Sequence, residues 1–250
     1  SAKVGWQIRR QIAAGTRCAL EHGGVAPVIV AADANVQQTV PLLSKAAFYH
    51  AGQVCVSVQR VFVHGSVIKE FLALLKQQVE KLVVGDPTQE STAVGPLIRA
   101  REVQRVAQWV SEALDAGAEL VSGGRILSNP NCYQPTILLN PPVDAKVSTE
   151  EVFGPVVCVY EFDAMETAIE RANGLAVSFQ SAVFTTNINQ ALQTAQRLDA
   201  AAVMINDHTA FRVDWMPFAG HRHSGLSTGG IAYTMHDMVQ DKLLVINGVL

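Results

Sequence analysis

Short apolar runs rich in β-branched residues alternate with amphipathic helical stretches along this chain, and this alternation limits its fold more than any other feature. "PVIVAA" (27–32) precedes a helix expected over 36–50, capped by Asp33 or Asn35. "VSVQRVFVH" (56–64) precedes a second apolar helix over 67–82, which follows Ser66, a candidate N-cap. Strand-to-helix steps of this kind connect parallel strands, because a parallel pair needs a long crossover.

The same alternation returns in the second half of the chain. "PVVCVYEF" (155–162) is typical of a buried strand, and Asp163 with Glu166 forms a capping-box pattern for a helix over 164–173. A strand over 181–186, a helix after Asn187 and a strand over 201–206 complete another β-α-β unit. The predicted fold is therefore α/β, with a largely parallel open sheet and helices on both faces.

Other segments complete the expected element order. Helices are expected over 2–14 and 99–116, and strands over 16–21 and 118–124. The final segment, 241–250, also has a strand pattern. Such an apolar terminal strand either joins its own sheet or pairs with another chain.

Composition narrows the class of protein. The 250 residues are 49% hydrophobic and 16% charged, which is enough apolar content for a sizeable core. A net charge of −3 provides no field that would attract nucleic acid or anionic lipid. Neither a membrane-spanning run nor a signal-peptide pattern is present. We therefore expect a soluble, cytoplasmic protein that binds neither nucleic acid nor membrane.

The four cysteines are Cys18, Cys55, Cys132 and Cys158, and they are widely separated. No C-x-x-C pair occurs, which disfavours both a zinc site and a disulfide framework. We expect free thiols and no metal. The sequence G-x-G-x-x-G is also absent, so the chain carries no complete dinucleotide-binding fingerprint.

Cys55 is the one cysteine in a promising place, at the boundary between a predicted helix and a predicted strand. Gly52, just before it, permits an unusual backbone turn that would present the thiol on a loop. A buried structural thiol is the plain alternative. The nearest bases in sequence are His50 and His64, and neither spacing is diagnostic. The residues alone therefore indicate cysteine chemistry without naming a reaction.

Four stretches, taken together and in order, resemble the aldehyde dehydrogenase superfamily. They are "LEHGG" (20–24), "GQVC" (52–55), "EEVFGPV" (150–156) and "PFAGHRHSG" (217–225). The resemblance covers essentially the whole chain. It departs from the family pattern at His22, Val25 and Ala219, where leucine, lysine and glycine are common.

The resemblance implies that Cys55 is the nucleophile and Glu21 the general base. A thiolate would add to an aldehyde, hydride would pass to NAD or NADP, and the resulting thioester would be hydrolysed by a water that Glu21 deprotonates. The alternative for Glu21 is a solvated carboxylate in a turn.

The resemblance also implies cofactor contacts. Glu151 would bind the nicotinamide ribose, and Phe153 would pack near the nicotinamide. Ser1 to Gly5 resemble the family's G-S-x-x-x-G turn without its first glycine, leading a helix whose amides face the pyrophosphate. The alternatives are a surface acid at Glu151 and a core aromatic at Phe153.

By the same resemblance, residues 1–24 are the remnant of a nucleotide-binding domain and 25–235 form the catalytic domain. Residues 236–250 would be a C-terminal strand for oligomerisation or pairing, and the complete enzyme would be a homo-oligomer. The family's upstream half, including an asparagine that donates to the oxyanion, is missing. One such donor is worth roughly 3 kcal/mol, so we expect little dehydrogenase activity from the chain alone.

The expected substrate is a small aldehyde. Trp215 and Phe218 would line its tunnel, and Arg212 would hold a carboxylate, sulfonate or phosphate group on it. Two other interpretations stay open: a noncatalytic binding or assembly module, and a cysteine-dependent acyl hydrolase that needs no cofactor.

Overall fold

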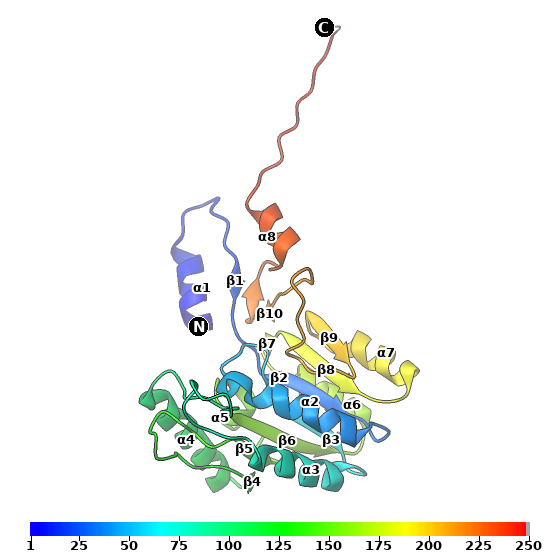
Figure 1. Cartoon of the computed structure of the whole chain (residues 1–250). Helices are drawn as coiled ribbons and strands as arrows, with labels where there is room; N and C mark the ends of the chain where they lie inside the picture. Colours follow the sequence, from blue (N-terminus) through cyan, green and yellow to red (C-terminus); the bar gives the residue numbers. More distant parts are fainter. Residues whose placement is uncertain (249–250) are drawn as a thin grey trace.

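A seven-stranded sheet forms the body of the protein in this computed structural model, which describes residues 1–248 (Figure 1). Its strand order is β4-β5-β6-β3-β2-β8-β9. The strands are β2 (Ala26–Val30), β3 (Val58–His64), β4 (Glu119–Ser122), β5 (Thr136–Leu139), β6 (Val156–Phe162), β8 (Gln180–Phe184) and β9 (Ala202–Ile205). All neighbours are parallel except β4 and β5. The predicted α/β fold with a largely parallel sheet is confirmed.

Helices cover both faces of this sheet. The connection from β2 to β3 runs one way across the sheet, and the connections from β6 to β8 and on to β9 run the other way. Because such crossovers are right-handed, these two sets of helices lie on opposite faces. One face carries α2 (Val36–Phe48) and α3 (Ile68–Glu80), and the other carries α6 (Met165–Asn173) and α7 (Ile188–Arg197). The remaining helices of the body are α4 (Ala100–Asp115) and the short α5 (Lys146–Thr149).

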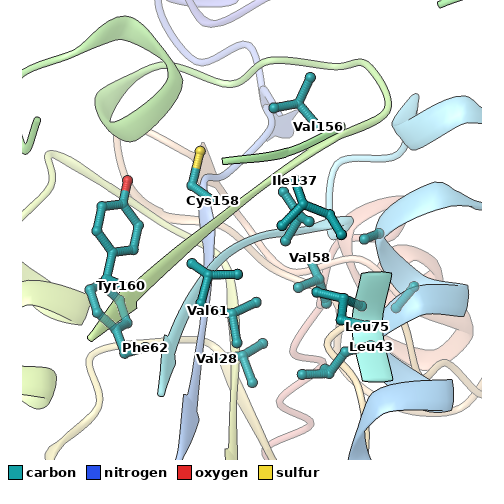
Figure 2. Packing of buried hydrophobic residues seen from close by; sticks show 14 of the residues in the cluster. Val28, Leu43, Val58, Val61, Phe62, Leu75, Ile137, Val156, Cys158 and Tyr160 are labelled. Carbon is teal, nitrogen blue, oxygen red and sulfur yellow. The ribbon is translucent and has the colours of Figure 1, made fainter. Parts of the chain in front are cut away.

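The core lies between the sheet and these helices. Figure 2 shows Leu43 and Leu75 on the side of the strands that bears Val61. On the other side lie Phe62 and Tyr160, whose rings stack at a centroid distance of 5.2 Å. Because both faces of the sheet are covered, β3 is buried at every position but its last, and β6 begins with the apolar run VVCVY.

The helix starts follow the sequence signals only in part. Asn35 caps α2, since its side chain accepts a hydrogen bond from the Gln38 amide at 3.1 Å. The predicted cap of α3 is wrong. Ser66 bonds to the ring of His64 instead, and α3 begins after Val67 without a side-chain cap.

The predicted capping box of α6 is wrong for a geometric reason. The residue at the cap position is Ala164, and no side chain caps the helix. Asp163 lies one residue too early for its carboxylate to reach the first free amides. Strand β5 was not predicted at all, because its sequence "TILL" is only four residues long.

A smaller part of the chain stands beyond one edge of the sheet (Figure 1). It contains α1 (Ala2–Gln11), α8 (Ile231–Asp237) and a two-stranded ribbon of β1 (Leu20–Glu21) with β11 (Gly225–Leu226). The predicted strand over 16–21 is thus only two residues long. A second ribbon pairs β7 (Val177–Ser178) with β10 (His221–Arg222).

The C-terminal segment extends away from the body (Figure 1). Residues 241–248 form no strand within this chain, and the Leu243 side chain is 87% exposed. A strand needs a hydrogen-bonded neighbour, and this segment has none within the described part of the chain. Its pairing with another chain stays a prediction, and positions 249–250 of that prediction lie outside the described residues. Within residues 1–248, no helix has the length and apolarity to cross a membrane.

Candidate active site

The predicted site residues gather at the edge of the sheet where parallel strands begin. Gly24 lies just before β2, Cys55 just before β3 and Gly154 just before β6. These three strands are neighbours, so the loops that lead into them meet. Sites in open parallel sheets more often lie at the opposite edge, beyond the carboxyl ends of the strands.

Cys55 and Glu21 lie close together in space. The distance from Cys55 Sγ to Glu21 Oε1 is 3.9 Å. The ribbon of β1 with β11 places Glu21, and the amide of Gly24 donates to the carbonyl of Cys55 at 3.3 Å, which joins the two segments. A thiol and a carboxylate at this separation can share a proton or a water molecule.

The turn before Cys55 has an unusual backbone conformation, as Gly52 predicted. His50, Ala51 and Gly52 all have positive φ angles, of 51°, 56° and 71°. A side chain at Gly52 could not fit, because its Cβ would lie 2.1 Å from the carbonyl oxygen of Gly154. Gln53 secures the turn by donating to the carbonyls of His50 and Pro96, at 3.1 and 3.3 Å.

Burial, then the negative charges of Glu21 and Glu151, raise the pKa of Cys55 to about 11, whereas Arg212 acts in the opposite direction. The resting thiol is therefore neutral at pH 7. Neither histidine considered from the sequence bonds to Cys55 among the described residues. His64 lies at the far end of β3 and bonds to Ser66.

Glu151 is partly buried and not the surface acid that the alternative interpretation assumed. Its Oε1 atom is fully buried and has no hydrogen-bond partner within residues 1–248. Burial raises the pKa of Glu151 to about 7, and the amino group of Ser1 lowers it. The carboxylate packs on Gly23, where a Cβ would lie 1.6 Å from Oε1. The structure therefore brings Ser1 and Glu151 together around a buried oxygen that has no hydrogen-bond partner within residues 1–248.

Phe153 is 42% exposed, so the alternative of a core aromatic is wrong. Its φ angle is 47°, in the left-handed region that bulky residues rarely adopt. Such a conformation costs of order 1 kcal/mol or more and is concentrated at functional sites.

Ser1 and Gly5 belong to a helix and not to the expected turn. Ser1 is the N-cap of α1 without a side-chain cap bond, and Gly5 lies inside the first turns. Gly5 packs against His22, whose Nε2 would lie 2.1 Å from an added Cβ. His22 is buried and bonds to the carbonyl of His223 at 3.0 Å. Here the absence of a side chain serves close packing, since Gly5 has no positive φ.

Apolar residues surround the other side of Cys55. Phe218, Phe179 and Val56 form a small cluster, and Cys55 packs against it. The Arg212 guanidinium lies over the Phe218 ring, 4.2 Å from its centroid. Trp215, expected to be a second wall, is 78% exposed and lies outside this cluster.

Sequence reasoning missed two residues of this site. Phe179 joins the apolar cluster from just before β8. Tyr49 is half-buried, and burial followed by the nearby charge of Cys55 raises the pKa of its hydroxyl. No motif identifies Phe179. Tyr49 lies six residues before Cys55, and this short separation in sequence could have indicated that the two side chains share the site.

Residues 1–244 match the aldehyde dehydrogenase family. The chain belongs to this family. A 3-sulfolactaldehyde dehydrogenase of Priestia aryabhattai is 38% identical over 248 residues, which are 99% of this chain and 51% of that protein. The chain spans about half the length of such relatives.

Two solved aldehyde dehydrogenase structures show the same arrangement. Glyceraldehyde-3-phosphate dehydrogenase GapN from Methanocaldococcus jannaschii, complexed with NADP, is 38% identical with a TM-score of 0.91 over 95% of this chain and 51% of its own. An aldehyde dehydrogenase of Mycobacterium tuberculosis complexed with NAD⁺ is 28% identical, with a TM-score of 0.93 over 100% of this chain and 53% of its own. The predicted family is confirmed, and these structures support the predicted choice of NAD or NADP.

Proposed function

We propose that this chain is the catalytic part of an NAD(P)-dependent aldehyde dehydrogenase that oxidises a small aldehyde to a carboxylic acid. The observation that carries the proposal is the 3.9 Å approach of Cys55 Sγ to Glu21 Oε1. These atoms lie at one edge of the sheet with Glu151 and Phe153.

Each step of the reaction has a residue suited to it. The sulfur of Cys55 bonds to the aldehyde carbon, and the carbonyl electron pair moves to oxygen. That oxyanion collapses and expels hydride, which leaves a thioester on Cys55. Glu21 takes a proton from water, the resulting hydroxide displaces the sulfur, and the acid is released with the thiol restored.

Bound NAD or NADP supplies the hydride acceptor. The residues present fit such a group. Glu151 offers a buried, unpartnered oxygen for a ribose hydroxyl, and Phe153 offers an exposed aromatic face. The amino end of α1 lies near Glu151, where free amides favour an anion.

Because the pKa of Cys55 is raised, we infer a second role for Glu21, which is to take the proton of the thiol. A neutral thiol must lose its proton as it attacks, and Glu21 is the carboxylate within 4 Å of it. Glu21 then releases this proton to solvent, and the regenerated carboxylate takes a proton from the water that hydrolyses the thioester.

We propose an anionic aldehyde as the substrate class. Arg212 lies close enough to Cys55 to lower its pKa and is itself exposed, so its guanidinium is free to bind a ligand anion. The named activities of two relatives concern aldehydes with a sulfonate or a phosphate group, which supports this choice.

We also propose that the complete enzyme is a homo-oligomer in which residues 241–248 pair as a strand. Support comes from their largely exposed apolar side chains, such as Leu243 and Leu244, at 87% and 74% exposed.

Single-turnover kinetics of the complete enzyme test the reaction. Cys55→Ser should remove the burst of reduced cofactor. Glu21→Gln should keep a burst when the thiol is deprotonated at high pH, but slow steady turnover by about a hundredfold or more, because hydrolysis lacks its base. Ester hydrolysis without any aldehyde-dependent hydride transfer would instead favour the acyl hydrolase.

A further inference from the structure

Gln59 is a buried residue of β3 whose side chain crosses to the segment that carries Glu151. Its Nε2 donates to the carbonyls of Val147 and Glu150, at 2.9 and 2.8 Å. Its Oε1 accepts from the amide of Val152 at 3.0 Å. Both donors of the amide group and one acceptor site are thus used on a single short segment.

Both backbone polar groups of Val152 form hydrogen bonds with side chains. Gln59 binds its amide, and the Arg105 guanidinium donates to its carbonyl at 2.7 Å. The Val152 side chain is itself buried, at 1% exposed. Glu151 and Phe153 lie on either side of this fixed residue, so its position sets where both of their side chains emerge.

The strained backbone at Phe153 needs such support. A bulky residue keeps a φ of 47° only where neighbouring contacts outweigh the local cost. On the other side of Phe153, Gly154 packs tightly against Val106, whose Cγ2 would lie 2.8 Å from an added Cβ. The Gln59 bond to Val152 on one side of Phe153 and the packing of Gly154 on the other side together stabilise this backbone conformation.

Burial alone does not explain three hydrogen bonds on one glutamine. Gln180, on β8, is also buried, at 1% exposed, and neither polar atom of its side chain has a partner within the described residues. The chain therefore contains a matched pair of buried sheet glutamines, of which only Gln59 is bonded to the segment beside the site.

We propose that Gln59 is a positioning residue for cofactor binding, which acts by fixing the 147–152 segment so that Glu151 and Phe153 face the nicotinamide riboside. This inference rests on the proposed function. It goes beyond that function because it names a residue on strand β3, outside the segment that contacts the cofactor, as the cause of the contact geometry.

The test compares Gln59→Leu with the control Gln180→Leu in the complete enzyme. Calorimetric titration should show that Gln59→Leu weakens NAD(P) binding by about tenfold or more, since it unmakes three buried hydrogen bonds. The KM for aldehyde should change far less than the KM for cofactor. Gln180→Leu should leave both KM values unchanged, because it removes an amide group that has no hydrogen-bond partner within residues 1–248.

Hydrogen exchange on the 250-residue chain provides a readout that needs no cofactor. The amide of Val152 should exchange faster in Gln59→Leu and keep its protection in Gln180→Leu. If Gln59→Leu fails to fold, Gln59→Glu replaces it, since that side chain retains an acceptor for Val152 but cannot donate to both carbonyls at neutral pH.

Two results would overturn the inference: unchanged exchange at Val152 in Gln59→Leu, or equal losses of cofactor affinity in the Gln59 and Gln180 variants. Failure of the proposed function looks different. The complete protein would then bind no NAD(P), while faster exchange at Val152 would still show that Gln59 holds the segment.

Discussion

At the scale of single residues, the site is governed by burial of ionisable groups. Burial, and then the nearby charges of Glu21 and Glu151, raise the pKa of Cys55. Arg212 is the cation that opposes the effect. The surroundings of Cys55 disfavour its thiolate form. The exposed Arg212 guanidinium can nevertheless bind an anionic group of a substrate.

Glu151 should make stability depend on pH in a defined window. Its pKa is raised to about 7 in the folded chain, so the folded state keeps a proton that the unfolded state loses above its ordinary value near 4.5. The free energy of unfolding should therefore fall as pH rises from about 4.5 to about 7.

Urea unfolding of the chain across this range measures the effect. Glu151→Gln should remove a slope on the order of 2 kcal/mol over the window, because it abolishes the titration. Glu150→Gln is the control, since Glu150 is the exposed neighbour. Identical pH slopes in the wild type and Glu151→Gln would contradict the assignment.

Arg212 should discriminate between aldehydes by charge. In the complete enzyme, Arg212→Ala should raise the KM for an aldehyde that bears a sulfonate, carboxylate or phosphate by about 10- to 100-fold, because a charge-assisted contact is lost. The KM for a neutral aldehyde of similar size should stay nearly constant. Steady-state kinetics with both substrates decide the matter, and equal changes for the two would remove the anionic substrate class.

At the scale of elements, short turns rather than helices or strands set the geometry of the site. The three consecutive left-handed residues of the turn at Tyr49–Gly52 carry the chain from α2 toward β3 and leave Cys55 facing Glu21. Gly52 is the residue of this turn that has no room for a side chain.

A comparison of two glycines tests that claim. Gly15 and Gly52 both have positive φ, but nothing lies within 4 Å of an added Cβ at Gly15. Gly15→Ala should cost about 1 kcal/mol for the backbone alone. Gly52→Ala should cost at least about 3 kcal/mol, because its Cβ also meets the carbonyl of Gly154.

Chemical unfolding of both variants gives the two free energies. The rate of Cys55 alkylation in Gly52→Ala should also differ from that of the wild type, because this turn sets the position of the thiol. Equal destabilisation by the two substitutions would show that crowding at Gly52 contributes nothing.

At the scale of the whole molecule, the chain spans about half the length of its relatives. It contains the proposed nucleophile, the base and the ribose contact. We predict that the purified 250-residue chain oxidises aldehydes with NAD(P) at less than roughly one thousandth of the rate of the complete enzyme, since we expect the oxyanion donor and most of the cofactor platform in the half of the relatives that this chain does not span. The absorbance of the reduced cofactor measures this rate, and a rate near that of the complete enzyme would refute the prediction.

Much of the fold could be predicted from the sequence because parallel strands buried on both faces are rich in apolar and β-branched residues. "VSVQRVFVH" and "PVVCVYEF" lead to β3 and β6 with ends within about two residues of the prediction. Helix caps were less predictable. Ser66 has the right chemistry for a cap, but a nearby ring nitrogen of His64 takes its hydroxyl instead.

The sequence by itself determined the alternation of strands and helices, the glycine that the turn before Cys55 requires, and the four motifs that resemble the family. These are local properties, fixed by the side chains and backbone freedom of a few adjacent residues. Only the tertiary structure decided that Glu21 lies 3.9 Å from Cys55, that Glu151 is buried without a partner and that Gln59 holds the segment beside it. Those facts depend on which loops meet at one edge of the sheet, and this is set by strand order and burial across distant parts of the chain.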